Sequence, residues 1–179
     1  MHKITLFLFL FAGALGYALF SFFGTYSSCH EAHRKVDSAY SDLISHGEEL
    51  TSLSVKMGAF ALKYLPNGRS IVNKMETTAQ NIRIHNSVSD LAVSCGKLYS
   101  SMKKVAVLLD ADIQANKNYR FQDAKLQFDK ISRDLSLSGK KYNNAAIQYN
   151  ITLQQPLPQF WSFMFNSEPA QLFKAKKKS

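Results

Sequence analysis

The sequence predicts an all-α protein: an antiparallel helical bundle of three long helices plus a short C-terminal helical segment, preceded by one N-terminal transmembrane helix. Three observations support this class. Apolar residues recur at steps of three and four through most of the chain, and one unbroken apolar stretch lies near the N-terminus. Helix breakers are scarce, because the 179 residues include only four prolines, three of them after residue 155. We therefore expect an anchor at residues 1–24, a bundle at 25–155 and a tail at 156–179.

The predicted anchor runs from Ile4 to Phe23 and contains almost only apolar side chains. Its 20 residues would form about 30 Å of helix, enough to cross a bilayer. A cleaved signal peptide and a lipoprotein signal at Cys29 are the competing readings. The positive charges flanking the stretch nearly balance, so the membrane side of the bundle stays open.

The most regular periodicity lies between Tyr119 and Gln154, which we expect to form the central helix of the bundle. Its predicted buried stripe consists of Phe121, Ala124, Phe128, Ile131, Leu135, Ser138, Tyr142, Ala145, Tyr149 and Thr152.

Two further helices are expected before this one. The stripe from Val36 to Tyr64 keeps its spacing of three and four residues unbroken through Gly47, so the transmembrane helix is expected to run on into the bundle. Pro66, Asn67 and Gly68 predict the reversal that follows. One helix from about Ser70 to Leu109 comes next, and Asn118 is a good N-cap for the central helix. Three long helices would leave Gln154 at the end far from the anchor, roughly 50 Å away.

Candidate catalytic chemistry is sparse. Cys29, His30, Glu31 and His33 place metal-ligand types close together beyond the anchor, although their spacing matches no zinc protease motif. A metal-dependent enzyme or metal-binding protein using this cluster is the alternative function. No catalytic residue, cofactor or metal ligand is assigned. Cys29 is expected to be an accessible thiol that does not pair with Cys95, which is expected to be buried.

A Tyr-Asn pair occurs twice, at Tyr142-Asn143 and Tyr149-Asn150, seven residues apart. Both rings fall on the predicted buried stripe. The two asparagines flank that stripe, where they are expected to hydrogen-bond within the bundle, with recognition of a partner as the alternative.

The tail is aromatic and then basic, and it contributes strongly to the formal net charge of +9. Lysine runs bind anionic headgroups at about 1 kcal/mol per residue near the surface, whereas no nucleic-acid-binding motif accompanies this one. Possible partner or lipid contacts are Phe160, Trp161, Phe163, Phe165, Lys174, Lys176, Lys177 and Lys178.

Several of these motifs together resemble the LemA family of bacterial single-pass membrane proteins. The matching features are Val36-Asp37-x-Ala39-Tyr40-Ser41, Ala115-Asn116 with Tyr119, the two Tyr-Asn pairs, and Pro169-Ala170 with Phe173. The resemblance implies an antiparallel bundle behind one N-terminal anchor and brings no catalytic residues. The chain departs from the family at Leu50–Leu53, Ile131-Ser132 and Asp110-Ala111.

The function expected from the sequence is a non-catalytic, membrane-anchored scaffold or adaptor of the bacterial cell envelope. Its expected partners are the membrane, through one span, and a protein of the envelope, without nucleic acid. The oligomeric state stays open.

Overall fold

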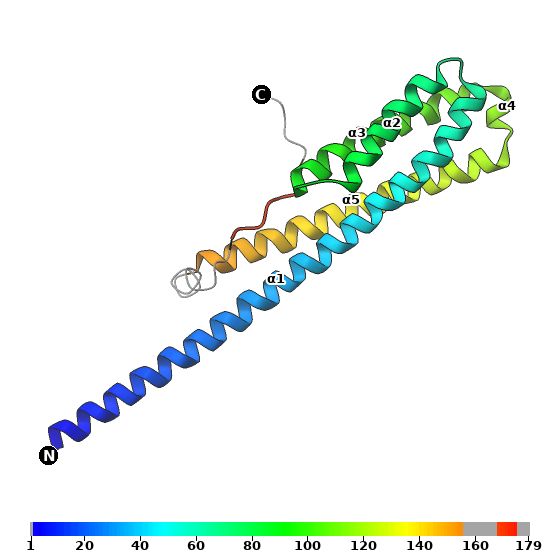
Figure 1. Cartoon of the computed structure of the whole chain (residues 1–179). Helices are drawn as coiled ribbons and strands as arrows, with labels where there is room; N and C mark the ends of the chain where they lie inside the picture. Colours follow the sequence, from blue (N-terminus) through cyan, green and yellow to red (C-terminus); the bar gives the residue numbers. More distant parts are fainter. Residues whose placement is uncertain (1, 156–167, 175–179) are drawn as a thin grey trace. The chain divides into compact units, whose positions relative to one another are not determined.

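A computed structural model describes residues 2–155 and 168–174, with the side chains of residues 2–7 left out (Figure 1). The elements are α1 (His2–Tyr64), α2 (Gly68–Arg83), α3 (Val88–Ala111), α4 (Ile113–Asn116) and α5 (Tyr119–Gln154). The described residues contain no strand, so the predicted all-α class is confirmed. Four of these helices are long, one more than predicted.

The chain forms two compact units. One comprises Met1–Asp37 with Asn144–Ala170, and the other comprises Ser38–Asn143 with Gln171–Ser179. Helices α1 and α5 each contribute to both units. We refer to the first as the anchor unit and to the second as the bundle unit.

Within the anchor unit, α1 continues without interruption from the apolar stretch into the residues beyond it, as the sequence predicts. The large apolar side chains of that stretch are exposed, with Phe9 at 74% and Phe20 at 79%. This is the one described helix that is long and apolar enough to cross a membrane.

The C-terminal part of α5 packs beside α1 just past the apolar stretch. The rings of His33 and Tyr149 meet edge to face at 5.3 Å. Ser28 on α1 and Thr152 on α5 line one shared groove. The prediction that Gln154 lies far from the anchor is therefore wrong.

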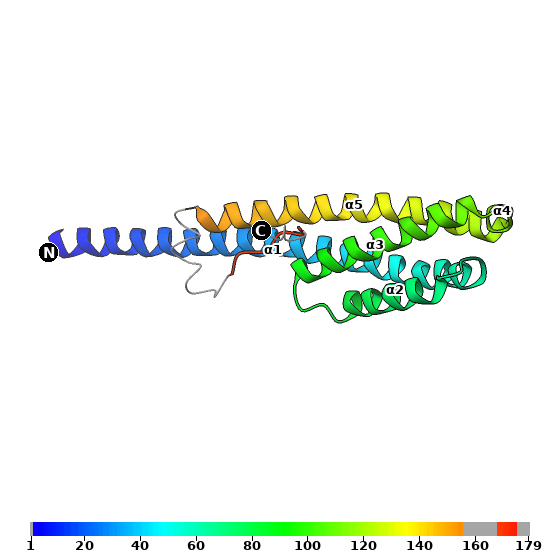
Figure 2. The same cartoon turned by 90° about the horizontal axis from the view of Figure 1, so that it is seen from above.

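The reason for this error lies in the bundle unit. The predicted single helix Ser70–Leu109 is two helices, α2 and α3, separated by residues 84–87. They lie side by side in two perpendicular views (Figure 1, Figure 2). The additional reversal makes the number of long helices even, and an even number returns the chain toward its starting end.

Local hydrogen bonds produce the break between α2 and α3. The Ser87 hydroxyl oxygen accepts from the Asp90 backbone N–H at 3.1 Å and donates to the Asp90 carboxylate at 2.8 Å, which caps the N-terminus of α3. His85 donates from Nδ1 to the Ile82 carbonyl at 2.6 Å, because a carbonyl only accepts. Its Nε2 then accepts from the Tyr40 hydroxyl at 2.7 Å.

The reversal between α1 and α2 follows Pro66, as predicted. Gly68 is needed there because it has no side chain, and not because its backbone is left-handed. A Cβ at Gly68 would collide with the Ala61 carbonyl. Asn67 has φ −102° and ψ 22°, outside the left-handed region. The glycine thus permits close approach of the two helices.

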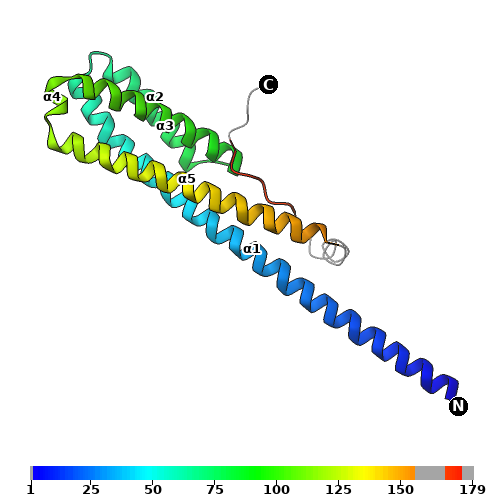
Figure 3. The same ribbon diagram turned by 180° about the vertical axis from the view of Figure 1, so that it is seen from behind.

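The core of the bundle unit contains most of the residues of the predicted stripes. In the part of α5 that belongs to the anchor unit, the predicted Ala145 and Thr152 are only half-buried, and the next residue is buried instead in each case, namely Ala146 and Leu153. The fully buried large side chains are Phe121, Leu43, Leu50, Met57, Met75, Leu91, Leu98, Met102, Leu109, Val105 and Thr51. Helix α4 connects α3 to α5, as the view from behind shows (Figure 3). The predicted cap at Asn118 is confirmed, since its side-chain oxygen accepts from the Arg120 N–H at 3.0 Å.

The predicted short C-terminal helical segment is not seen where the structure describes the tail. Residues 168–174, here called the C-terminal segment, contain no helix. Residues 156–167 lie outside the described part of the chain.

Candidate functional site

The C-terminal segment is held by two asparagines of α5. In the anchor unit, Asn150 donates from Nδ2 to the Ala170 carbonyl at 2.9 Å. Its Oδ1 accepts from the Ala170 N–H at 2.8 Å. One side-chain amide therefore makes both hydrogen bonds that a neighbouring β-strand would make with one residue.

The bundle unit repeats this arrangement. Asn143 donates from Nδ2 to the Phe173 carbonyl at 3.2 Å and accepts from the Phe173 N–H at 2.7 Å. The adjacent Tyr142 hydroxyl donates to the Gln171 carbonyl at 2.8 Å. We call Asn150 with Ala170, and Asn143 with Phe173, the asparagine clamps. Because they contact only backbone atoms, they recognise chain conformation and not side-chain identity.

Each clamp lies within one unit, Asn150 with Ala170 in the anchor unit and Asn143 with Phe173 in the bundle unit. The sequence prediction that both asparagines bond internally is thus correct, although they bind the C-terminal segment and not another helix.

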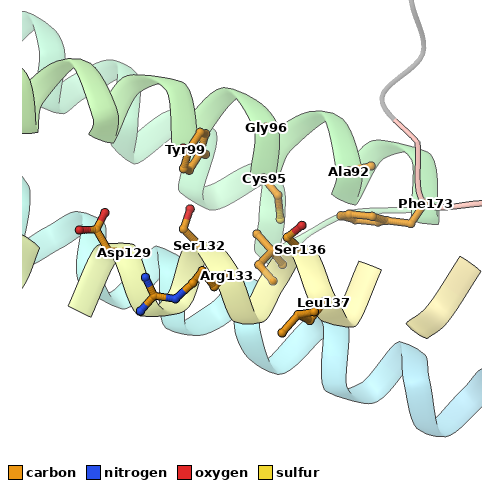
Figure 4. Close-up of a pocket in the computed structure, with 11 residues that line it drawn as sticks. Ala92, Cys95, Gly96, Tyr99, Asp129, Ser132, Arg133, Ser136, Leu137 and Phe173 are labelled. Atoms are coloured by element: carbon orange, nitrogen blue, oxygen red, sulfur yellow. The ribbon is translucent and has the colours of Figure 1, made fainter. Parts of the chain in front are cut away.

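Side-chain recognition enters through Phe173. Its ring lies at one end of a groove of about 810 Å³ between α3 and α5, within the bundle unit (Figure 4). Gly139 makes room for it, because a Cβ there would lie 2.9 Å from Phe173 Cδ1. The other residues that line the groove are Ala92, Cys95, Gly96, Tyr99, Asp129, Ser132, Arg133, Leu135, Ser136 and Leu137.

The groove contains one thiol, and burial keeps that thiol in its protonated form. Its thiol, Cys95, is only 2% exposed, and burial raises its pKa to about 12. The thiolate that nucleophilic catalysis requires is therefore suppressed at neutral pH. The side chains of Asp129 and Arg133 place one charge of each sign on the α5 wall of the groove (Figure 4).

The ring of Tyr142 packs against another aromatic side chain. Its ring packs 5.8 Å from that of Tyr40, whose hydroxyl bonds His85 at the break between α2 and α3. Burial raises the pKa of Tyr40, so this hydroxyl stays protonated and available as a donor. Tyr142 is thereby linked through Tyr40 to the α2–α3 connection.

Three residues of the predicted Cys-His cluster each contact a side chain outside the cluster. Glu31 pairs with Lys35 at 2.8 Å, and His33 pairs with Asp37 at 2.9 Å. The ring of His30 stacks on Tyr26. Within residues 2–155 and 168–174, no three His, Cys, Asp or Glu side chains form a group that could hold a metal ion.

The accessibility expected of Cys29 is wrong. Its side chain is 7% exposed, and burial raises the pKa of its thiol. The expected burial of Cys95 is correct, and both cysteines are free. Cys29 is covered because the returning end of α5 packs against this part of α1, a neighbour absent from the predicted topology.

Most of the predicted partner or lipid contacts lie outside the described residues. These are Phe160, Trp161, Phe163, Phe165, Lys176, Lys177 and Lys178. Lys174 is described and is exposed, directly after the clamped Phe173. The assignment of these residues stays a prediction.

The sequence contains a pattern that relates to the clamps, but helix periodicity alone does not show what this pattern binds. The two Tyr-Asn pairs stand one heptad apart, which puts both asparagines on the same side of α5. Their partners lie 20 and 30 residues away, so no local pattern could identify them. Gly139 and Phe173 were likewise not singled out as a contacting pair.

Comparison of the chain with models of known protein families and with curated proteins finds no match.

Proposed function

We propose that this protein is a non-catalytic, membrane-anchored adaptor, similar to LemA proteins and located in a bacterial cell membrane. The observation that carries the proposal is the exposed apolar beginning of α1, which continues as one helix into a packed unit. Exposed apolar side chains over this length are stable in lipid and costly in water.

The clamps support the adaptor role. Proteins that bind peptides commonly form hydrogen bonds to the peptide backbone and offer pockets for its side chains. The segment held here belongs to the same chain, so the surface is already shaped for such an occupant. We therefore assign the partner-binding role to α5 and the groove beside it, with the lysines after Phe173 available to anionic lipid or to an acidic partner.

Extraction of membranes with alkaline carbonate tests the anchor. The full-length chain should stay in the membrane pellet. A variant with Ala14→Arg and Ala18→Arg should move to the soluble fraction, because each arginine at the centre of a span costs about 2.5–3.5 kcal/mol. The intact mass of the membrane-bound chain separates an anchor from a cleaved signal peptide, since cleavage would remove the apolar stretch.

Partner binding is tested by crosslinking in native membranes, followed by purification of the full-length chain. We expect protein partners to be crosslinked to the unsubstituted chain. These partners should be absent when the chain carries both Asn143→Leu and Asn150→Leu. Metal analysis of the purified protein addresses the enzyme alternative. Stoichiometric zinc bound through Cys29 and its neighbours would overturn the non-catalytic assignment.

A further inference from the structure

We propose that the groove between α3 and α5 binds a small single-chain amphiphile whose head group is a phosphoethanolamine zwitterion. This ligand site goes beyond the proposed adaptor role. Every residue that forms it belongs to the bundle unit. It therefore depends neither on the anchor nor on how the anchor unit is placed.

The shape of the groove suits an elongated ligand. Its volume of about 810 Å³ falls within the range of small-molecule sites, roughly 300–1,000 Å³. The Phe173 ring lies at one end (Figure 4), and Asn143 holds the Phe173 backbone through two hydrogen bonds. A Cβ at Gly96 would meet nothing within 4 Å, so the groove is open there. On the α5 wall, Asp129 and Ser136 lie seven residues apart, a rise of about 10.5 Å.

The lining of the groove next to Phe173 suits an apolar chain. Helix α3 contributes Ala92, Cys95 and Gly96, and α5 contributes Leu135. The Cys95 thiol adds no charge, because burial raises its pKa to about 12. An alkyl chain that lies against these side chains leaves water together with them, which is favourable.

The end of the groove opposite Phe173 carries one charge of each sign (Figure 4). Asp129 and Arg133 stand at positions i and i+4 of α5, where Cβ atoms are about 5–6 Å apart. On α1, Glu31 with Lys35 forms an ion pair at this same spacing. Among the described residues, neither Asp129 nor Arg133 forms an ion pair or a side-chain hydrogen bond. Both charged groups are therefore available to a ligand.

The two charges define the head group of the ligand. A guanidinium binds a phosphate through paired hydrogen bonds, and a carboxylate accepts hydrogen bonds from an ammonium group. In phosphoethanolamine an ethylene spacer separates these two groups, whereas in an α-amino acid only the α-carbon does so. The longer spacer suits side chains one helical turn apart. Arg133 accordingly holds the phosphate, Asp129 holds the ammonium, and the chain extends toward Phe173.

Equilibrium dialysis tests whether this ligand binds. The receptor is the full-length chain in non-ionic detergent micelles, and empty micelles correct for partitioning of the ligand. The probe is hexyl 2-aminoethyl phosphate, which has the head group and a short chain. We expect saturable binding that strengthens about fourfold with each added methylene group. Phosphoethanolamine without a chain should bind at least tenfold more weakly, and equal binding would show that a free head group is the ligand and overturn the proposal.

A matched ligand tests the two charged side chains. In the glycerol analogue, hexyl 2,3-dihydroxypropyl phosphate, the ammonium is absent. Asp129→Asn should weaken binding of the ethanolamine probe about tenfold or more and leave binding of the glycerol analogue unchanged. Arg133→Gln should weaken binding of both phosphates about tenfold or more. Equal losses for the two ligands in Asp129→Asn, or unchanged binding of both in Arg133→Gln, would overturn the proposal.

Filling the groove tests where the ligand lies. Gly96→Leu adds a side chain where the groove is open and should abolish saturable binding of the probe. Ser100→Leu is the control, because Ser100 is exposed on the same helix and does not line the groove. If circular dichroism shows that Gly96→Leu is not folded, Ser132→Leu on the facing wall takes its place. Undiminished binding in a folded groove-filling variant, or no saturable binding by the unsubstituted chain, would contradict the proposal.

Discussion

At the scale of single residues, Gly139 and Gly96 offer a matched pair. Both lie inside long helices, where alanine is favoured over glycine by about 0.5–1 kcal/mol. A Cβ at Gly96 would meet nothing within 4 Å, whereas a Cβ at Gly139 would collide with the Phe173 ring. Both positions therefore share the helix preference for alanine, and they differ in whether an added Cβ has room.

We expect Gly96→Ala to stabilise the protein by about 0.5–1 kcal/mol in chemical unfolding. Gly139→Ala should stabilise it less, and it should expel Phe173. Hydrogen exchange of the Phe173 amide, which is bonded to Asn143 Oδ1, reports that expulsion directly. Unchanged protection of this amide in Gly139→Ala would show that the ring adapts to the added methyl group.

Cys95 gives a prediction about pH. Burial raises its pKa from 9.0 to about 12 in the folded protein. Between these values the unfolded chain releases the proton while the folded protein keeps it. The free energy of unfolding should therefore decrease as pH rises from about 9 to 12.

Comparison with Cys95→Ala isolates this effect, because lysines and tyrosines titrate in both proteins. The difference in unfolding free energy between the two should narrow steadily above pH 9. Parallel pH profiles would mean that the folded protein does not hold the thiol in its protonated form. At pH 8, native Cys95 should also react with iodoacetamide about 1000-fold more slowly than an unperturbed thiol.

At the scale of elements, the break between α2 and α3 determines where α5 leads. One local feature of this break is the Ser87 cap, in which the hydroxyl oxygen accepts from the Asp90 N–H. Ser87→Ala should cost about 1 kcal/mol of stability, measured by thermal or chemical unfolding of the full chain in detergent. Ser87→Asp keeps an acceptor at the cap and should restore most of the loss.

Asn67 is the control for this prediction. It occupies the corresponding position before α2, but its side chain makes no capping hydrogen bond. Asn67→Ala should consequently have little effect. An equal loss at both positions would indicate that the Ser87 side chain has no special role in starting α3.

At the scale of the whole molecule, the contacts within the anchor unit predict that α5 ends close to the apolar stretch of α1. Ser28 and Thr152 line the same groove, and Ser28 follows the apolar stretch by five residues, about 8 Å of helix. A fluorophore on Ile151→Cys, in a background with Cys29→Ala and Cys95→Ala, should be quenched strongly by lipids labelled at their headgroups. Ile151 is 46% exposed, so the label is accessible.

Two controls define this measurement. Vesicles without quencher give the unquenched signal, and a chain without residues 2–23 shows how much quenching arises without the anchor. Absence of quenching in the anchored chain would mean that α5 ends far from the membrane, as the sequence alone suggested.

The sequence alone determined the helical class, the exposed apolar stretch, most of the buried stripes and the cap at Asn118. These features depend on local spacing and local hydrogen bonds, since helix periodicity and capping extend over only a few residues. The sequence also placed Asn143 and Asn150 beside the buried stripe of α5. It missed the cap of Ser87 on Asp90, although its spacing is that of a capping box, because the apolar stripe continued past it.

Only the tertiary structure decided the direction of α5 and the partners of its asparagines. One additional reversal inverts every later helix, so a local error at residues 84–87 became an error about the position of Gln154. The partners of Asn143 and Asn150 were undetermined because a side-chain amide bonds backbone atoms of any residue. Asn143 bonds Phe173 where the ring of Phe173 fits against Gly139, and that space exists only once the chain has folded.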